Sequence, residues 1–464
     1  MTIVSKIIIS LLPCAIMAAG CASPGTPVTP APSADTRKVP EIILDNPSLT
    51  GGLMYVYDYK ADKYTAPTPK GYKPFYVSTF GRHGARYALK AQYMMIKRVL
   101  DCASREGLLT ERGKQLREVY NSFSKDAIYC EGELTDIGRE QLRTIAGRLF
   151  ERYPEVFEGD TRIVAISSPV SRVIMSMVSF VDELQERDKT LTVDENGSES
   201  YSPLVRPNWG PLDFERPQSI EEIAAPYIPY FKSTVDIKGI LERIISEPEK
   251  VLAKTKTDEV LLVRNIFDVS NGYCCIPGKD SPFEDLFTPE DRFAIFRAAW
   301  SRVMRFLGRY EGAESLYPDF LAYTLKDIIE KADADIADGD VQLRLRFSHD
   351  SSVMPLAVLM DLDGKGRTAI NPDEALEIFH PWDMPMGGGF QFIFFRKGKN
   401  DDILVKVLWN EEDATLPIGN GPYYKWDDFK AFYTPIINNT ISKLDIMREE
   451  SKDKKKTKSE YAYY

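Results

Sequence analysis

The chain has 464 residues, 43% of them hydrophobic, so it can bury a large core as two or three domains or as one domain with a large insertion. Its formal net charge of −10 argues against a nucleic-acid partner and favours a soluble, acidic surface. A binding site for a polyanion would therefore have to be a local cluster of basic residues.

Residues 1–20 resemble an export signal. Lys6 precedes an apolar run that ends at Ala19, is too short to span a membrane, and is followed by small residues. The segment before Cys21, Ala18-Ala19-Gly20, resembles a bacterial lipoprotein cleavage box and predicts lipidation of Cys21. The alternative is an ordinary signal cleaved nearby, which exports the protein without an anchor. Residues 21–40, rich in Pro, Ser, Thr and Ala, predict a flexible linker.

The segment Phe75–Arg86, FYVSTFGRHGAR, reads as a buried strand followed by a loop with a concentrated positive charge. β-Branched and aromatic residues fill the strand, and Gly81 and Gly84 permit turns that a side chain would obstruct. The loop then presents Arg82, His83 and Arg86 together. Ligands of open α/β sheets bind beyond the strands' carboxyl ends, so the loop is a candidate anion site, with a surface ion network as the alternative.

The next elements predict a parallel sheet with helical connections. Helices are expected at 89–106 and 109–123 and from Leu134 to about Tyr153, where Pro154 ends the third. The strand 163–168 follows, and it leads into a helix that carries Arg172. This restores the strand, loop and helix order of a parallel α/β sheet.

Residues 207–339 show helical periodicity broken by prolines, which predicts an inserted, mainly α-helical cap. The strand 341–349 then delivers His349 and Asp350 to the start of a helix at 351–360. Two further strands are expected at 391–396 and 403–409, and a closing helix at 426–447. We therefore predict an α/β three-layer sandwich around a mostly parallel sheet, with core segments 41–206 and 340–450 and a frayed tail at 451–464.

The motifs at Arg82–Arg86, Arg172 and His349-Asp350 resemble those of the histidine acid phosphatases, branch 2 of the histidine phosphatase superfamily. That family carries an R-H-G-x-R motif and a distal H-D, which are matched here by Arg82–Arg86 and by His349-Asp350. The family also has a strand followed by a helix that carries a phosphate-binding arginine, and the strand 163–168 and the helix with Arg172 match this feature. The resemblance covers residues 73–433 and is loose between 207 and 339. Tyr87-Ala88 stands where the family often has a proline.

The resemblance implies a metal-independent phosphomonoesterase that needs no cofactor. His83 is expected to attack phosphorus, while Arg82, Arg86, Arg172 and His349 bind the phosphate oxygens. Asp350 is expected to protonate the leaving group and then to activate water, which favours an acidic working pH. Inositol polyphosphate phosphatases of this branch typically have H-A-E, so the H-D here favours acid phosphatases and phytases.

Two other functions stay open. One is a mutase-like phosphotransferase, which the export signal disfavours because sugar-phosphate metabolism is cytoplasmic. The other is a catalytically silent surface lipoprotein that binds phosphorylated ligands, which the intact set of site residues disfavours. We expect an exported monomer of the periplasm or outer membrane, with a small phosphomonoester as its ligand and membrane contact only through the lipid anchor.

Cysteine usage agrees with export. Cys102 and Cys130 flank the helical pair after the first strand, and in an oxidising compartment they predict a disulfide. The adjacent pair Cys274 and Cys275 offers a competing partner for either of them. We expect no metal site, because no second Cys or His pair lies near the adjacent cysteines. His380 is interpreted as a packed or surface histidine.

Overall fold

The computed structural model describes residues 38–126, 129–207, 216–276, 283–398 and 402–461. Within these residues, eight strands form one sheet in the order β3-β2-β4-β1-β5-β6-β7, with β8 paired to β6. The strands are β1 (Lys73–Arg82), β2 (Arg162–Ser167), β3 (Thr192–Asn196), β4 (Leu343–Ser348), β5 (Gly389–Arg396), β6 (Leu404–Trp409), β7 (Glu412–Asp413) and β8 (Tyr423–Lys425).

The sheet is parallel on one side of β1 and antiparallel on the other. Strands β3, β2, β4 and β1 pair in parallel, whereas β5, β6, β7 and β8 pair antiparallel. The expected strands at 391–396 and 403–409 are therefore β5 and β6, and they extend the sheet as hairpins. Arg82 pairs with Ser348 and Ser167 with Phe347, so the carboxyl ends of the parallel strands meet at one edge.

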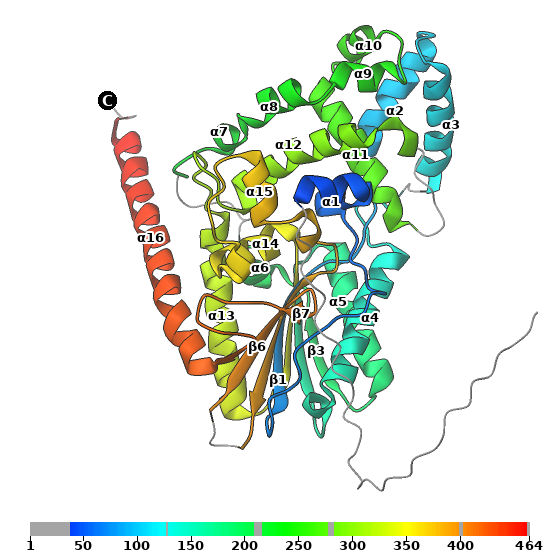
Figure 1. Ribbon diagram of the computed structural model, residues 1–464. Coiled ribbons are helices and arrows are strands. Elements are labelled where there is room, and N and C mark those ends of the chain that lie inside the picture. The colour runs from blue at the N-terminus through cyan, green and yellow to red at the C-terminus, as the bar shows by residue number, and fades with distance from the viewer. Residues whose placement is uncertain (1–37, 127–128, 208–215, 277–282, 399–401, 462–464) are drawn as a thin grey trace, which may run out of the picture. The chain divides into compact units, whose positions relative to one another are not determined.

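Helices cover both faces of the sheet, which gives the predicted three layers (Figure 1). On one face, α4 (Asp136–Arg152) and α5 (Ser171–Arg187) pack on a hydrophobic cluster that includes Val77. On the other face, α13 (Tyr317–Asp338) and α14 (Asp350–Leu359) belong to a cluster that includes Phe80. Strand β1 is thus apolar on both sides, as expected for a central strand buried by helices.

In strand β4, arginines alternate with apolar residues, and both arginines form ion pairs inside the protein. Arg346 is fully buried, and its guanidinium contacts Asp327 of α13 at 2.8 Å. Arg344 contacts Asp335 of the same helix at 2.7 Å. Asp335 also accepts a hydrogen bond of 2.8 Å from the Tyr76 hydroxyl on β1. These ion pairs fix α13 against the sheet, because a buried charge that lost its partner would be strongly destabilising.

The other helices, apart from the closing helix α16 (Trp426–Tyr461), form a helical region beyond the carboxyl edge of the parallel strands. They are α1 (Val39–Asp45), α2 (Lys90–Arg105), α3 (Glu111–Asp126), α6 (Ser202–Val205), α7 (Ile220–Ala224), α8 (Tyr227–Thr234), α9 (Ile237–Glu242), α10 (Pro248–Thr255), α11 (Glu259–Gly272), α12 (Pro289–Leu307) and α15 (Pro372–Ile378). Short 3-10 turns complete the chain: η1 (Pro47–Met54), η2 (Pro154–Phe157), η3 (Glu199–Tyr201), η4 (Tyr273–Cys275), η5 (Glu284–Leu286), η6 (Leu362–Gly364) and η7 (Pro381–Asp383).

The helical region is not one continuous insert. Helix α2 packs against α10 and α11, so residues that precede the predicted cap belong to the same layer. Conversely, α13 was predicted as part of the cap but packs against α14, β1 and the closing helix α16 (Trp426–Tyr461). Sequence periodicity identified helices correctly here, but it does not say which layer a helix joins.

The chain ends also differ from expectation. Helix α1 begins at Val39, which is buried, so the linker predicted at 21–40 ends before that residue. Helix α16 continues past Met447 to Tyr461, where a frayed tail was expected. Residues 448–461 contain no Pro or Gly and many Lys and Glu, which favour a helix. The export signal, most of the linker, Cys21 and residues 462–464 lie outside the described residues.

The predicted disulfide between Cys102 and Cys130 is wrong in this structure, where Cys102, Cys130, Cys274 and Cys275 are free. Cys102 lies near the end of α2, about 18 Å along the helix axis from its first residue. Cys130 lies beside the start of α2, because the amide of Gly132 donates to the carbonyl of Ala88. A disulfide requires Cα atoms within about 7 Å of each other, so the antiparallel return of α3 separates the two thiols.

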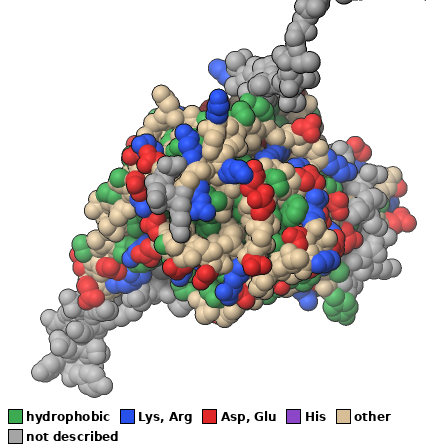
Figure 2. Space-filling view, turned by 90° about the horizontal axis from the view of Figure 1, so that it is seen from below, with side chains coloured by type: hydrophobic (Ala, Val, Ile, Leu, Met, Phe, Trp, Pro, Cys, Tyr) green, Lys and Arg blue, Asp and Glu red, His purple; other side chains and the backbone are tan. Residues whose placement is uncertain are grey.

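On the face opposite the helical region (Figure 2), described side chains of both charge signs lie next to one another. Figure 2, seen from below the view of Figure 1, shows acidic and basic side chains interspersed with scattered apolar ones. None of the described helices is long and apolar enough to cross a membrane. Among the described residues, Arg82, Arg86 and Arg172 instead gather at the carboxyl edge of the parallel strands, where their Nε atoms are buried.

Candidate active site

Arg82 lies at the end of β1 and is completely buried. Its guanidinium donates to the carbonyls of Met384, at 2.7 Å, and Leu53, at 2.5 Å, and to the carboxylate of Asp350, at 2.8 Å. Burial lowers the pKa of Arg82 to about 10, while the charge of Asp350 opposes this shift. The side chain therefore stays cationic and is held rigidly by two carbonyls and one carboxylate.

His83 follows Arg82 and is almost fully buried. Its Nδ1 lies 2.9 Å from the carbonyl oxygen of Gly84. A carbonyl can only accept, so we assign the proton to Nδ1, which leaves the lone pair on Nε2. Burial and then the charges of Arg82 and Arg172 lower the pKa of His83 well below its ordinary value. The result is a neutral imidazole with a free nucleophilic nitrogen among cations.

His349 and Asp350 come to the same place from β4. The rings of His83 and His349 meet edge to face, with centroids 5.6 Å apart. His349 Nε2 lies 2.9 Å from Ser168 Oγ, at the end of the neighbouring strand β2. Burial and then the charge of Arg172 lower the pKa of His349 to about 3, so this second histidine is also neutral. A neutral imidazole at this position can donate a hydrogen bond without adding charge.

Asp350 is the first residue of α14, and its side chain is 22% exposed. One carboxylate oxygen contacts Arg82, and the other accepts a hydrogen bond of 2.7 Å from the amide of Ser351. Burial raises the pKa of Asp350, but the charges of Arg82 and Arg86 and the hydrogen bond from Ser351 outweigh burial, and the pKa falls below its ordinary value. The carboxylate is therefore ionised when no anion is bound.

Three arginines surround the histidines and share one feature. The Nε atoms of Arg82, Arg86 and Arg172 are buried and have no hydrogen-bond partner. Arg86 otherwise donates to the carbonyl of Tyr87, and Arg172, in the first turn of α5, donates to the carbonyl of Gly132. Burial and then the charge of Arg86 lower the pKa of Arg172 to about 10. Buried donors without partners are rare, and three of them around a neutral imidazole make this cluster a candidate site for a compact anion.

All six residues that the sequence analysis assigned to the site lie together. They are Arg82, His83, Arg86, Arg172, His349 and Asp350, and each lies at or just after the carboxyl end of β1, β2 or β4. His380 lies elsewhere, stacked on Trp382 with a ring separation of 4.9 Å, and it is partly exposed, as interpreted from the sequence.

Sequence analysis missed the residues that support the loop from Arg82 to Arg86. The amide of Gly84 donates to Ser176 Oγ at 3.1 Å, and the amide of Ala85 donates to Gln141 Oε1 at 2.8 Å. Ser176 and Gln141 belong to α5 and α4, so the two helices that cover one face of the sheet also hold the loop. Both are buried polar residues inside helices, and no local pattern distinguished them from other helix positions.

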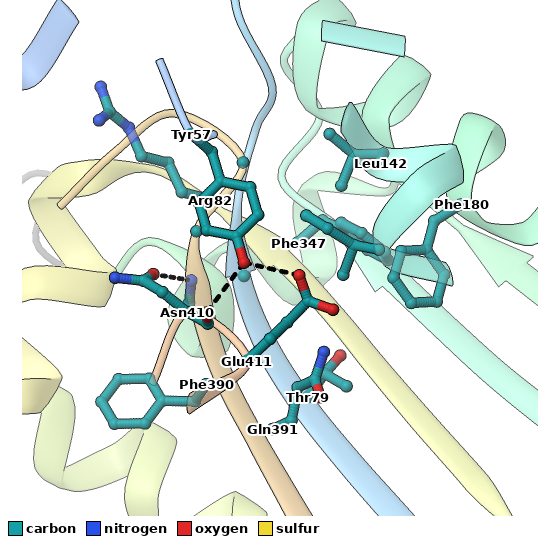
Figure 3. Close-up of a pocket in the computed structure, with 15 residues that line it drawn as sticks. Tyr57, Thr79, Arg82, Leu142, Phe180, Phe347, Phe390, Gln391, Asn410 and Glu411 are labelled. Atoms are coloured by element: carbon teal, nitrogen blue, oxygen red, sulfur yellow. Dashed lines mark hydrogen bonds between the residues drawn. The ribbon is translucent and has the colours of Figure 1, made fainter. Parts of the chain in front are cut away.

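A second support comes from the turn between β6 and β7. The side chain of Asn410 accepts from the amide of Gly389 and donates to the carbonyl of Asp383, both at 3.0 Å. These two hydrogen bonds hold the segment from Asp383 to Gly389. Within that segment, the amide of Gly387 donates a hydrogen bond to the carbonyl of His83. Figure 3 shows a small pocket beneath the loop, where the Tyr57 hydroxyl donates to Glu411 and to the backbone of Asn410. The run of glycines at 387–389 was the available signal for this close backbone approach.

Two glycines, Gly84 and Gly138, lie against each other beneath the loop, because a Cβ added to Gly84 would lie 2.8 Å from Gly138 Cα. A Cβ added to Gly138 would lie 2.2 Å from the carbonyl oxygen of Ala85. We therefore expect Gly138→Ala to push α4 off the loop, to lower the free energy of unfolding by about 1–3 kcal/mol and to reduce turnover. Urea denaturation and p-nitrophenyl phosphate hydrolysis measure the two effects.

Gly51→Ala is the matched control, because its added Cβ would meet only Tyr55 Cβ at an ordinary 3.4 Å. Gly51 lies in η1, and this variant should match the wild type in both assays. Unchanged stability and turnover in Gly138→Ala would show that the loop does not depend on this contact.

The model of the histidine phosphatase superfamily, branch 2, matches residues 76–410, which is more than half of the chain and spans the whole arginine and histidine cluster. The chain belongs to this superfamily. It is a phosphatase of the histidine type, and the resemblance seen in the sequence is confirmed.

Individual relatives are distant but extensive. Human multiple inositol polyphosphate phosphatase 1 is 20% identical over 419 residues, covering 80% of this phosphatase and 81% of the human protein. The Bifidobacterium longum multiple inositol polyphosphate phosphatase, in complex with inositol hexasulfate, superposes with a TM-score of 0.64 at 18% identity, covering 83% of this chain and 97% of that one. The phytase from D. castellii superposes with a TM-score of 0.62 at 15% identity, covering 84% and 85%. These structures confirm the fold.

Proposed function

We propose that this phosphatase hydrolyses phosphomonoesters of polyphosphorylated sugars, such as inositol polyphosphates, through a phosphohistidine at His83. The observation that carries the proposal is the free Nε2 of a neutral, buried His83 among three arginines whose buried Nε donors lack partners. The names of the human, Bifidobacterium longum and D. castellii relatives support the substrate class.

In the first half of the reaction, His83 Nε2 attacks phosphorus, a P–N bond forms, and the P–O bond to the alcohol breaks. Arg82, Arg86 and Arg172 spread the charge of the three phosphoryl oxygens, which is the main catalytic requirement of phosphoryl transfer. The departing alkoxide needs a proton. Asp350 is the partly exposed carboxyl group beside the site that can supply it.

Asp350 must gain that proton against the charges that lower its pKa. A bound phosphate ester brings negative charge to Arg82 and Arg86, and negative charge near a carboxyl group raises its pKa. We therefore place the protonated acid in the substrate complex and the carboxylate in the empty site. In the second half, the ionised Asp350 accepts a proton from water, water attacks phosphorus, the P–N bond breaks, and inorganic phosphate leaves.

The motif after His349 distinguishes this chain from part of its family. Inositol polyphosphate phosphatases typically show H-A-E, and this chain has His349-Asp350-Ser351. The sequence alone favoured acid phosphatases and phytases, whereas the similar proteins include inositol polyphosphate phosphatases as well as phytases. Phytate, the hexakisphosphate of inositol, suits both groups and is the substrate that we propose testing first.

The test is release of inorganic phosphate from p-nitrophenyl phosphate and from phytate between pH 3 and pH 8, with a chelator present. We expect turnover of both esters, a faster rate at acidic pH, and no effect of the chelator. Release from neither ester would overturn the proposal. Release from p-nitrophenyl phosphate alone would keep the chemistry and reject the substrate class.

A further inference from the structure

The segment after β3, residues 197–206, crosses the carboxyl edge of the parallel strands. β3 runs parallel to β2, so the chain leaves it on the side of the sheet where the arginines and histidines lie. A Cβ added to Gly197 would lie 2.9 Å from Ile174 Cγ1 and 3.1 Å from Ser167 Oγ. The segment therefore passes directly over the end of β2 and the first turns of α5, the helix that carries Arg172.

Helix α6 (Ser202–Val205) then fixes the segment beside His349. The carbonyl of Leu204 accepts a hydrogen bond of 2.7 Å from Thr324 Oγ1 on α13. The carbonyl of Val205 accepts a hydrogen bond from the hydroxyl of Ser348, the last residue of β4. Val205 is completely buried. Arg206 directly follows Val205, and His349 directly follows Ser348, so this hydrogen bond brings Arg206 and His349 close together.

Arg206 is a cation that the phosphohistidine chemistry does not use. Its side chain is 14% exposed and contacts both carboxylate oxygens of Glu199 at 2.6 Å. The Glu199 side chain is 72% exposed, so solvent weakens its hold on Arg206. Burial and then nearby charges, including that of Arg206, lower the pKa of His349, which agrees with a guanidinium close to that ring.

We propose that Arg206 is a specificity-determining residue that binds a second phosphate of a polyphosphorylated substrate while the first lies on His83. The inference rests on the proposed function and deepens it. Arg82, Arg86 and Arg172 suffice for the phosphate that is cleaved, whereas Arg206 reaches the site from the loop after β3. A phosphate on a neighbouring ring carbon carries up to two negative charges and displaces the exposed, singly charged Glu199, because guanidinium binds phosphate in the same bidentate way.

The kinetic test compares two substrates. In Arg206→Gln, kcat/KM for phytate should fall about 10- to 100-fold through a higher KM, the range expected for a lost charge-assisted hydrogen bond. For p-nitrophenyl phosphate, which has one phosphate, kcat/KM should stay within about twofold. In Glu199→Gln, kcat/KM for phytate should rise, because Arg206 no longer has a competing carboxylate.

Arg162→Gln is the matched control. Arg162 lies at the amino end of β2 and pairs with the exposed Asp194, so it is also a paired arginine but lies away from the site. This variant should leave both substrates unchanged. An equal loss for both substrates in Arg206→Gln would mean that Arg206 merely positions His349 and would overturn the proposal, as would no loss for either substrate.

A binding measurement separates this proposal from the proposed function. Calorimetry with inositol hexasulfate needs no turnover. We expect Arg206→Gln to weaken hexasulfate binding by about tenfold or more and to leave the affinity for inorganic phosphate unchanged. If the wild type binds hexasulfate without hydrolysing phytate, the proposed function fails while Arg206 is still tested. If the variant binds hexasulfate as tightly as the wild type, the specificity role is rejected.

Discussion

Replacing His83 by alanine is expected to abolish both turnover and the phosphorylated enzyme. The variant keeps the arginines that we propose bind phosphate, but it loses the Nε2 nitrogen that we propose forms the P–N bond. Loss of a nucleophile normally costs several orders of magnitude in rate. Hydrolysis of p-nitrophenyl phosphate gives the rate, and brief exposure to radiolabelled ester followed by an alkaline quench preserves the acid-labile phosphohistidine.

His380→Gln is the control for this experiment. His380 is a partly exposed histidine away from the arginine cluster, and its change should leave turnover within about twofold of the wild type. Turnover of His83→Ala above about a hundredth of the wild-type rate would sink the assignment of the nucleophile. Phosphate binding should persist in His83→Ala, because Arg86 and Arg172 do not depend on the imidazole for their hydrogen bonds.

The site could be predicted because its residues lie at comparable places in the chain. His83, Arg172 and His349 each follow an apolar run that reads as a strand, and parallel strands bring their carboxyl ends to one edge. To apply this rule, one needs to know only which segments are strands and that they run parallel. Strand β4 was recognisable although Arg344 and Arg346 are charged, because its apolar residues still alternate with period two.

The support beneath the site could not be predicted because it depends on contacts distant in sequence. Gln141 is 56 residues from Ala85, and no helical pattern marks it as the acceptor for that amide. The same holds for Arg206, whose place beside His349 follows from a bond between Val205 and Ser348, 143 residues apart. Such pairings arise from how layers pack, and a single sequence does not encode them locally.

The incorrect disulfide has the same origin. Two cysteines flanking a helical pair suit a bridge only if the second helix returns to the end of the first. Here α3 returns towards the start of α2, beside Ala88, and leaves Cys102 at the far end. Helix periodicity predicted that α2 and α3 exist, but it did not predict where the chain goes after α3.

The second large effect is expected for Asp350→Asn, and it should depend on the leaving group. Asparagine has nearly the same shape and cannot supply the proton that an alkoxide needs. General acid catalysis contributes about 10²- to 10⁴-fold, so phosphate release from phytate should slow by that order. p-Nitrophenolate is stable without a proton, so its release in the first turnover, before Asp350 is needed to activate water, should slow far less. The ratio of the two rates measures the acid role without reference to protein concentration.

The pH profile gives an independent check with a definite sign. The pKa of Asp350 in the empty site is below its ordinary value, so free enzyme loses this proton already at acidic pH. With phytate, the wild-type rate should therefore fall as pH rises and the acid is lost. Because asparagine does not titrate, Asp350→Asn should lack that decline and remain slow throughout. Protonation of His83 should not lower the rate over the pH interval where Asp350 loses its proton, because the pKa of His83 lies well below the ordinary value for histidine.

Asp427→Asn serves as the matched control, since this carboxylate lies in the first turn of α16 with a side chain 92% exposed. It should change neither rate. Equal slowing of alcohol release from both esters in the first turnover of Asp350→Asn, before the phosphohistidine is hydrolysed, would instead mean that Asp350 acts through Arg82, whose guanidinium it contacts at 2.8 Å. Binding of inorganic phosphate separates these cases. Removal of a negative charge beside Arg82 should tighten phosphate binding if Asp350 is the acid, whereas loss of a positioning contact would weaken it.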